Sequence, residues 1–370
     1  MRITRLFIIL SLFSGSLFAY NSYPYASLLQ TFRQPLLPLD ESIEDSASAR
    51  LTVNWMNVWA YSSGNYLIDG EELQTEAAVK YRFNNITAGI SIPAVRQGGG
   101  VLDTTIERFH SLVNVTQSGR DHYPGDVINV SFEPLGRLYW LIDDDPLMTW
   151  LRSFDTRLYP RTIFNAPLSM NDIQNSLVMD YITIHYPELL MADVTEVVIL
   201  SDARRATGNP RFFAEKSLVE SRNFGKLSGG IQLKIPSAFV PLLTTPGWDK
   251  SVYAVYSRKL DPLWSIKTGL SYTRFEFTSF NVFDMPDDQW VFRQELQYKF
   301  SKNMSLHGEY VYFTSPVLGW GKLSKPGHLV SFGISGKNDN ITYRVAVIED
   351  IVNFNNTADI GFNSSIEASL

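Results

Sequence analysis

The clearest pattern in this chain is an alternation of apolar and polar residues that returns in many short segments. Between residues 288 and 313, two such segments flank the connection Ser301-Lys302-Asn303. A repeat of two residues is that of a β-strand, and both segments exceed the usual strand length of about 5 to 6 residues. In the first segment one face carries Trp290, Phe292, Leu296, Tyr298 and Phe300, and the other carries Val291, Arg293, Glu295, Gln297 and Lys299. The stretch predicts a membrane-spanning β-hairpin with a lipid face and a wet face.

The same alternation predicts strands along most of the chain. We expect them at residues 51–61, 77–83, 86–92, 226–235, 249–260, 263–277, 289–300, 303–313, 327–337, 340–350 and 358–370. Shorter strands are expected at 127–132, 176–186 and 194–200, whereas residues 204–223 look polar and irregular, and Asp69-Gly70 looks like a turn. Short turns alternate with long loops, which favours an all-β, antiparallel transmembrane barrel of about 12 strands, with 14 as the alternative.

Aromatic residues of these strands fall into two groups, as in the interfacial girdles of membrane barrels. Near the short turns lie Tyr81, Phe83, Trp264, Tyr298 and Phe300, and near the long loops lie Trp59, Tyr61, Tyr272, Trp290, Phe292, Tyr310 and Tyr312. The last alternating segment, 358–370, is similar to the C-terminal strand that outer-membrane assembly machinery recognises, although it ends in Leu370 rather than an aromatic residue.

The first residues predict export. Arg2 and Arg5 precede an apolar run and a small residue, Ala19, which together suggest a secretory signal peptide over residues 1–19. Residues 20–47 are then expected to form an extended segment that is periplasmic or plugs the barrel mouth, and 48–370 to form the barrel, with a long external loop at about 97–172. The chain contains no cysteine, so neither disulfides nor a lipidated cysteine are expected. Loss of the two arginines would take the formal charge from −6 to −8, which disfavours nucleic acid as a partner.

Several segments are similar to a known family. They are Tyr66 to Glu71, Gly98 to His110, Gly119-Arg120-Asp121, Leu233 to Pro236, and the closing Ile348-Glu349-Asp350 with Ala358 to Gly361. In these the chain resembles the bacterial domain of unknown function 3187, whose members are predicted outer-membrane proteins. The resemblance covers most of the chain but departs between about 140 and 225. It implies the fold and the outer membrane of a Gram-negative bacterium as the compartment, and it supplies no activity.

The sharpest cluster of polar residues follows a triple glycine. From Leu102 to Val113 the apolar period becomes helical, and Asp103, Glu107 and His110 share one face of the expected helix. Such a face, with Arg120 nearby in sequence, would anchor the loop inside the barrel through caps and ion pairs. The alternatives are binding of a substrate or cation, or catalysis. We favour the anchor and expect no metal site.

A second set of candidate residues is predicted to face the lumen. Its members are Lys80, Arg82, Lys234, Lys267, Arg293, Glu295, Lys299, His307, Glu309, Arg344 and Glu367. In an open pore such charges set ion preference. In a small barrel they would pair across strands as a polar core. The pattern leaves both readings open.

We therefore expect a channel or facilitator for a small solute of unknown identity. The alternatives are a non-catalytic structural or surface barrel, and an outer-membrane hydrolase acting on lipid or lipopolysaccharide, which would need a nucleophile or metal near His110. A secreted β-sandwich would instead bury the aromatic face under a second sheet. We expect no cofactor. The expected partners are outer-membrane lipid, lipopolysaccharide and the barrel-assembly machinery.

Overall fold

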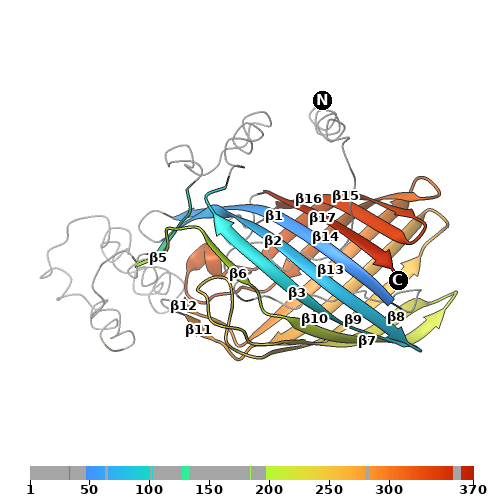
Figure 1. Cartoon of the computed structure of the whole chain (residues 1–370), viewed down its shortest axis with the longest axis horizontal. Helices are drawn as coiled ribbons and strands as arrows, with labels where there is room; N and C mark the ends of the chain where they lie inside the picture. Colours follow the sequence, from blue (N-terminus) through green and yellow to red (C-terminus); the bar gives the residue numbers. More distant parts are fainter. Residues whose placement is uncertain are drawn as a thin grey trace, which may run out of the picture.

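The computed structural model describes residues 33, 47–62, 66–100, 102, 127–132, 184, 197–280, 283–352 and 360–370. Twelve strands form a closed antiparallel barrel, as the alternation predicts (Figure 1). In chain order they are β1 (Ala47–Ser62), β2 (Tyr66–Phe83), β3 (Ile86–Gly98), β7 (Arg211–Ser221), β8 (Gly225–Lys234), β9 (Asp249–Lys259), β10 (Trp264–Arg274), β13 (Asp288–Lys299), β14 (Met304–Phe313), β15 (Gly327–Asn338), β16 (Ile341–Asp350) and β17 (Ile360–Ser369). The pairing of β1 with β17 closes the ring.

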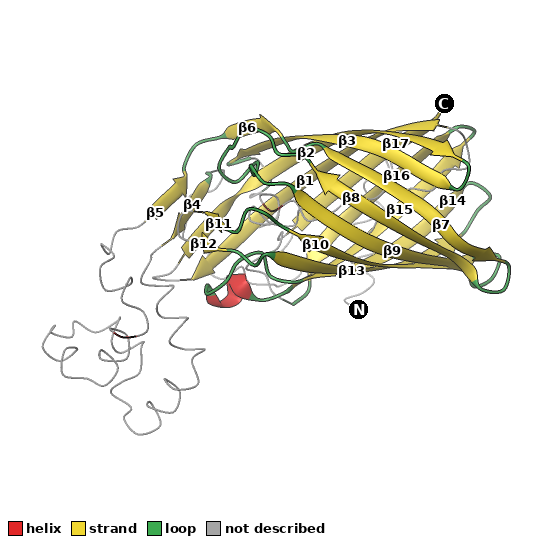
Figure 2. Ribbon diagram, turned by 90° about the horizontal axis from the view of Figure 1, so that it is seen from below, coloured by secondary structure: helices red, strands yellow, loops and turns green. Residues whose placement is uncertain are grey.

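Short strands add to the barrel at one end. β4 (Asn129–Phe132) pairs with the start of β2, and β5 (Val197–Leu200) pairs with β4. β6 (Arg204–Thr207) pairs with the end of β3, while β11 (Ser279–Phe280) and β12 (Phe283–Asp284) form a small separate hairpin. Figure 2 shows these strands at the end opposite the chain's C-terminus, the end with the longer connections, which we call the loop end. The other end is the short-turn end.

The alternating residues point to opposite faces of the wall, as predicted. Along β13, Trp290 is 44% exposed on the outer face, whereas its neighbour Val291 is fully buried on the inner face. Other outward residues such as Val79, Ile231 and Phe332 are also exposed, and inward Lys80, Arg293 and Arg344 are buried. Among the described residues no helix is long and apolar enough to cross a membrane. The aromatic residues near the short turns lie outward, and Trp264 packs on Tyr298 with ring centroids 4.7 Å apart.

Three sequence-based expectations require correction or fall outside the structure. Residues 204–223 are not irregular: β6 and β7 occupy most of them, and β7 is a wall strand of the barrel. Asp69-Gly70 is not a turn. Both residues lie within β2, which begins at Tyr66, and Asp69 pairs with Asn129 of β4. Strands at 129–132 and 197–200 are present. The expected strand at 176–186 lies outside the described residues except Ile184, which is helical.

Trp59 also departs from the expected girdle. It lies on the outer face of β1 but is only 5% exposed, whereas Phe83 at the other end of the barrel is 67% exposed. The outer wall near Trp59 is therefore covered by protein at the loop end. The expected girdle of exposed aromatic residues is clearer at the short-turn end, where Tyr81, Phe83 and Phe300 are exposed on the outer wall.

Close packing inside the wall depends on a glycine of β3. A Cβ atom at Gly89 would lie 2.5 Å from both the ring of Phe213 and the backbone oxygen of Val79. Because the second neighbour is backbone, the clash cannot be relieved by a side-chain rotation. Gly308 offers a matched comparison, since a Cβ atom there would meet Phe332 at 3.5 Å, an ordinary contact.

We therefore expect Gly89→Ala to destabilise the barrel by about 1 to 3 kcal/mol, the usual cost of overpacking. The temperature at which the compact, heat-modifiable form is lost on gels measures the effect. Gly308→Ala should leave that temperature unchanged. Equal melting of the two variants would contradict this account of the β3–β7 contact.

Candidate functional site

The inner wall at mid-height carries a four-residue ion-pair network. Arg293 contacts Glu309 at 2.5 Å and Glu295 at 3.5 Å, all between nitrogen and carboxylate oxygen atoms. Arg344 contacts the same two carboxylates, Glu295 at 3.1 Å and Glu309 at 3.6 Å. The four side chains come from β13, β14 and β16, and all are buried. Each charge therefore faces two of opposite sign, which is the arrangement a buried charge requires.

Further pairs line the opposite part of the wall. Glu76 on β2 pairs with Arg211 on β7 and lies 3.9 Å from Arg50 on β1. Nearer the short-turn end, Lys80 contacts Glu367 at 2.6 Å. Nearer the loop end, Lys234 on β8 pairs with Asp249 on β9. Removing one member of such a buried pair leaves an isolated charge and typically costs about 3 to 5 kcal/mol. The networks therefore link non-neighbouring strands and stiffen the wall.

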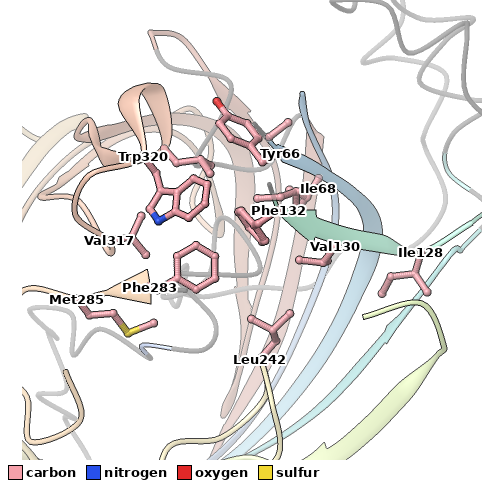
Figure 3. Packing of buried hydrophobic residues seen from close by; sticks show 13 residues of the cluster. Tyr66, Ile68, Ile128, Val130, Phe132, Leu242, Phe283, Met285, Val317 and Trp320 are labelled. Carbon is pink, nitrogen blue, oxygen red and sulfur yellow. The ribbon is translucent and has the colours of Figure 1, made fainter. Parts of the chain in front are cut away.

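At the loop end the lumen contains an apolar cluster rather than charges. Its buried residues are Val58, Ala60, Tyr66, Ile68, Ile128, Val130, Phe132, Leu242, Phe283, Met285, Val317, Trp320 and Leu323. Figure 3 shows Phe132 at its centre, with Phe283 and Trp320 beside it. The ring centroids of Phe132 lie 4.5 Å from Phe283 and 5.1 Å from Trp320. We call this set the mouth cluster. It packs rings from several segments against one another at the loop-end mouth.

Much of the mouth cluster is carried by connecting segments. Leu242 belongs to the β8–β9 connection, and Val317, Trp320 and Leu323 belong to the β14–β15 connection. Leu242 is fully buried although its φ of 61° is unfavourable for a residue with a side chain. Its carbonyl oxygen accepts a hydrogen bond of 3.1 Å from Gln97 on β3. The β8–β9 connection is thus folded into the lumen and held there.

Asn209, in the break between β6 and β7, fixes the ends of the same connection. Its amide nitrogen donates to the carbonyl oxygens of Ile235 at 3.0 Å and Thr245 at 2.8 Å. Its side-chain oxygen accepts from the backbone N–H of Thr245 at 3.1 Å. Asn209 is fully buried, so these bonds replace water for three backbone groups. The strand break therefore has a structural role.

Arg33, from the segment that precedes the barrel, is also buried near this mouth. Its guanidinium lies 3.8 Å from the centre of the Phe275 ring and donates to the carbonyl oxygens of Phe277, at 2.7 Å, and Pro286. Burial lowers the pKa of Arg33 to about 10, so the side chain remains a cation at neutral pH. On the exposed rim nearby, hydrogen bonds from the Trp248 backbone and from Lys250 hold the pKa of Glu276 below its usual value.

The structure distributes the predicted lumen residues along the barrel axis. Lys80, Lys234, Arg293, Glu295, His307, Glu309 and Arg344 are buried on the inner face, and Lys267 and Glu367 are half-buried there. Arg82 and Lys299 lie at the inner-face positions nearest the short turns and are exposed. Arg293, Glu295, Glu309 and Arg344 come together, as do Lys80 and Glu367. The proposed loop anchor, Asp103, Glu107, His110 and Arg120, lies outside the described residues, as does most of its helix.

An anchor for the start of this loop is nevertheless visible, and sequence reasoning missed it. Glu71 points outward from β2, yet it is only 5% exposed. One of its carboxylate oxygens accepts from Trp55 Nε1 at 2.8 Å, and the other accepts from the backbone N–H of Leu102. Gly100 has a φ of 71° and approaches so closely that a Cβ atom there would overlap the Glu71 carboxylate. The signal available in the sequence was an acidic residue at an outward strand position, where a lipid-facing residue would be apolar.

Within the described ranges, no group of three or more His, Asp or Glu side chains is placed to hold a metal ion. His307 is buried beside β15, and His328 contacts the Tyr310 hydroxyl at 2.7 Å.

Comparison with known proteins gives one family match and several structural similarities. A family model described as "Protein of unknown function (DUF3187)" matches residues 15–137 and 211–368, which leaves out a segment close to the one where the resemblance departs. No curated protein matches the sequence. The structure is similar to the COG4313 outer membrane channel from Pseudomonas putida F1, with a TM-score of 0.51 and 7% identity, covering 95% of this chain and 99% of that one. This likeness supports the fold.

Weaker similarities are to other barrels. The Pseudomonas putida toluene transporter TodX has a TM-score of 0.34 and 10% identity, covering 96% of this chain and 94% of that one. The KdgM porin in complex with disordered oligogalacturonate has a TM-score of 0.39 and 8% identity, covering 87% of this chain and 99% of that one.

The Glu71 anchor can be tested because the chain has no natural cysteine. A single Leu102→Cys probe should react slowly with a maleimide, since Leu102 is 6% exposed. Adding Glu71→Ala should accelerate labelling about tenfold, the factor for losing one charged hydrogen bond of about 1.4 kcal/mol. Adding Leu73→Ala, the next outward position on β2, is the control and should not change the rate. Equal rates in the two backgrounds would refute the anchor.

Proposed function

We propose that this chain, which belongs to the DUF3187 family of proteins of unknown function, is an outer-membrane channel for a small solute, and that the mouth cluster closes its lumen at the loop end. The observation that carries the proposal is that much of the mouth cluster lies on connecting segments and not on wall strands. Leu242, Val317 and Trp320 lie on segments outside the wall strands, so moving them would leave the pairing of β8 with β9 and of β14 with β15 intact. In this proposal the mouth cluster is a closure that opens when its packing and the Gln97–Leu242 hydrogen bond are broken.

The proposed orientation places the short turns in the periplasm and the loop end outside. Support comes from the bare, aromatic-lined wall at the short-turn end and from the extra strands at the loop end. Outward Val79, Ile231 and Phe332 would contact lipid. Contacts with lipopolysaccharide and with the barrel-assembly machinery, through β17, are part of the same proposal.

A second candidate, a non-catalytic structural barrel, is favoured by a different observation. The mid-height networks hold Arg293, Glu295, Glu309 and Arg344 in mutual contact and nearly out of reach of solvent. Such compensation is expected of a filled small barrel. A channel would require a path beside these pairs. No observation on the described residues favours a hydrolase.

The two candidates differ in what happens when the mouth cluster is weakened. We expect the refolded protein to conduct in planar phosphatidylcholine bilayers in rare, short openings. The double variant Phe283→Ala/Trp320→Ala should raise the open fraction at least tenfold, because truncating each buried ring removes about 3 to 5 kcal/mol of packing.

The matched control is Trp290→Ala/Phe332→Ala, which truncates two exposed aromatic residues on the outer wall. It should leave the open fraction unchanged. Absence of conductance in all three proteins, with the heat-modifiable barrel retained, would reject the channel and favour the structural barrel.

A further inference from the structure

The hairpins at the short-turn end share a pattern of cross-strand pairs. In four of them, a basic residue at the last inward position faces a hydroxyl residue on the next strand. The pairs are Arg82 with Thr87, Lys259 with Ser265, Lys299 with Ser305, and Lys337 with Thr342. In the fifth hairpin, Lys226 of β8 faces Glu220 of β7. We call Arg82, Lys226, Lys259, Lys299 and Lys337 the basic ring.

Strand parity places these side chains on the inner face. Lys299 is two positions from Gln297 and four from the buried Glu295, and Lys259 shares parity with the buried Ser251. Unlike those residues, Lys259, Lys299 and Lys337 are exposed to solvent. The basic ring therefore lies where the lumen opens at the short turns.

Three members of the ring surround a hollow of about 440 Å³. Its lining contains four lysines, Lys259, Lys299, Lys302 and Lys337, and one acidic residue, Asp261. The Asp261 carboxylate already accepts hydrogen bonds from the backbone N–H groups of Leu263 and Trp264, at 2.7 and 2.8 Å. Gln297, Ser305 and Thr342 add uncharged donors to the lining. The hollow thus has an excess of positive charge and several hydrogen-bond donors.

The excess contrasts with the charge of the whole chain and with the paired charges at mid-height. The whole chain has a formal charge of −6. At mid-height, basic and acidic side chains pair closely, as Arg293 does with Glu309. A concave surface of one sign focuses its field and concentrates counter-ions by about 10-fold to 10³-fold. Charged rings at a pore mouth also set ion preference.

We infer that the hollow inside the basic ring is a binding site for small anions, carboxylates or phosphates, and that it makes the short-turn mouth anion-selective. The ammonium groups supply the charge, and the neighbouring hydroxyl and amide groups supply directed hydrogen bonds. The binding site stands on the geometry alone, whereas the selectivity of passage rests on the proposed function. The inward direction of the lysines points to a free solute in the lumen rather than to lipid headgroups.

The test of selectivity is the reversal potential across a planar bilayer of neutral phosphatidylcholine under a KCl gradient. We expect the wild-type protein to prefer chloride over potassium. Lys259→Gln/Lys299→Gln should lower the chloride-to-potassium permeability ratio about tenfold, the lower end of the focusing effect. The control, Lys216→Gln/Arg258→Gln, removes two basic residues from the outward positions of β7 and β9 at the same end. It should leave the ratio unchanged. If the chloride-to-potassium permeability ratio of Lys259→Gln/Lys299→Gln equals that of the control, the proposed anion selectivity is wrong.

Binding is measured separately, so that failure of the channel does not hide the result. The anisotropy of the trisulfonated dye pyranine is followed with full-length protein in neutral detergent at low salt, where charge interactions are least screened. Binding that is at least tenfold weaker in Lys259→Gln/Lys299→Gln, but kept in the control, supports the site even if no protein conducts. Binding that is absent, or equal in both variants, overturns the site. Absence of conductance alone rejects only the proposed function.

Discussion

The pairing of β1 with β17 is the contact on which the rest of the structure depends. It runs from Ser48–Ser369 to Asn57–Ile360 without a register shift and turns a sheet with two open edges into a ring. Inside a bilayer no water can satisfy an open strand edge, so only a closed barrel can span it with strands. Closure also fixes which residues face the lumen, because register and side-chain parity are linked. The ion pairs and the basic ring follow from that parity.

The two ends of the barrel are built by different means. At the short-turn end the wall strands themselves form the rim, and the side chains that face inward there belong to regular cross-strand pairs such as Lys299 with Ser305. At the loop end, packing is done by segments between strands, and it relies on special conformations such as the positive φ of Leu242. Between them, compensated charges hold the wall at mid-height.

The sequence predicted what alternation can encode. It was sufficient for the strand at 289–300, for its turn at 301–303 and for the inward side of Glu295 and Arg293, because each depends on a local repeat of two. It failed at β7, where Glu215 and Lys216 break the contrast between faces: the glutamate lies buried inside and the lysine lies exposed outside. It also misread Asp69-Gly70, where pairing with β4 overrides a local turn preference. The mouth cluster could not be foreseen, since Phe132, Leu242 and Trp320 are brought together by folding and not by spacing.

The seam between β1 and β17 also has a consequence for the order in which the barrel can be made. Ser48 donates a hydrogen bond of 2.8 Å to Glu367, 319 residues away. Contacts at such separation form late, because the loop between them must be closed first. Hairpins such as β13–β14 can form early and locally, but the ring cannot seal until both distant strands are present. Until then, the open sheet exposes two unpaired edges, so the assembling chain requires protection from aggregation that the finished barrel does not.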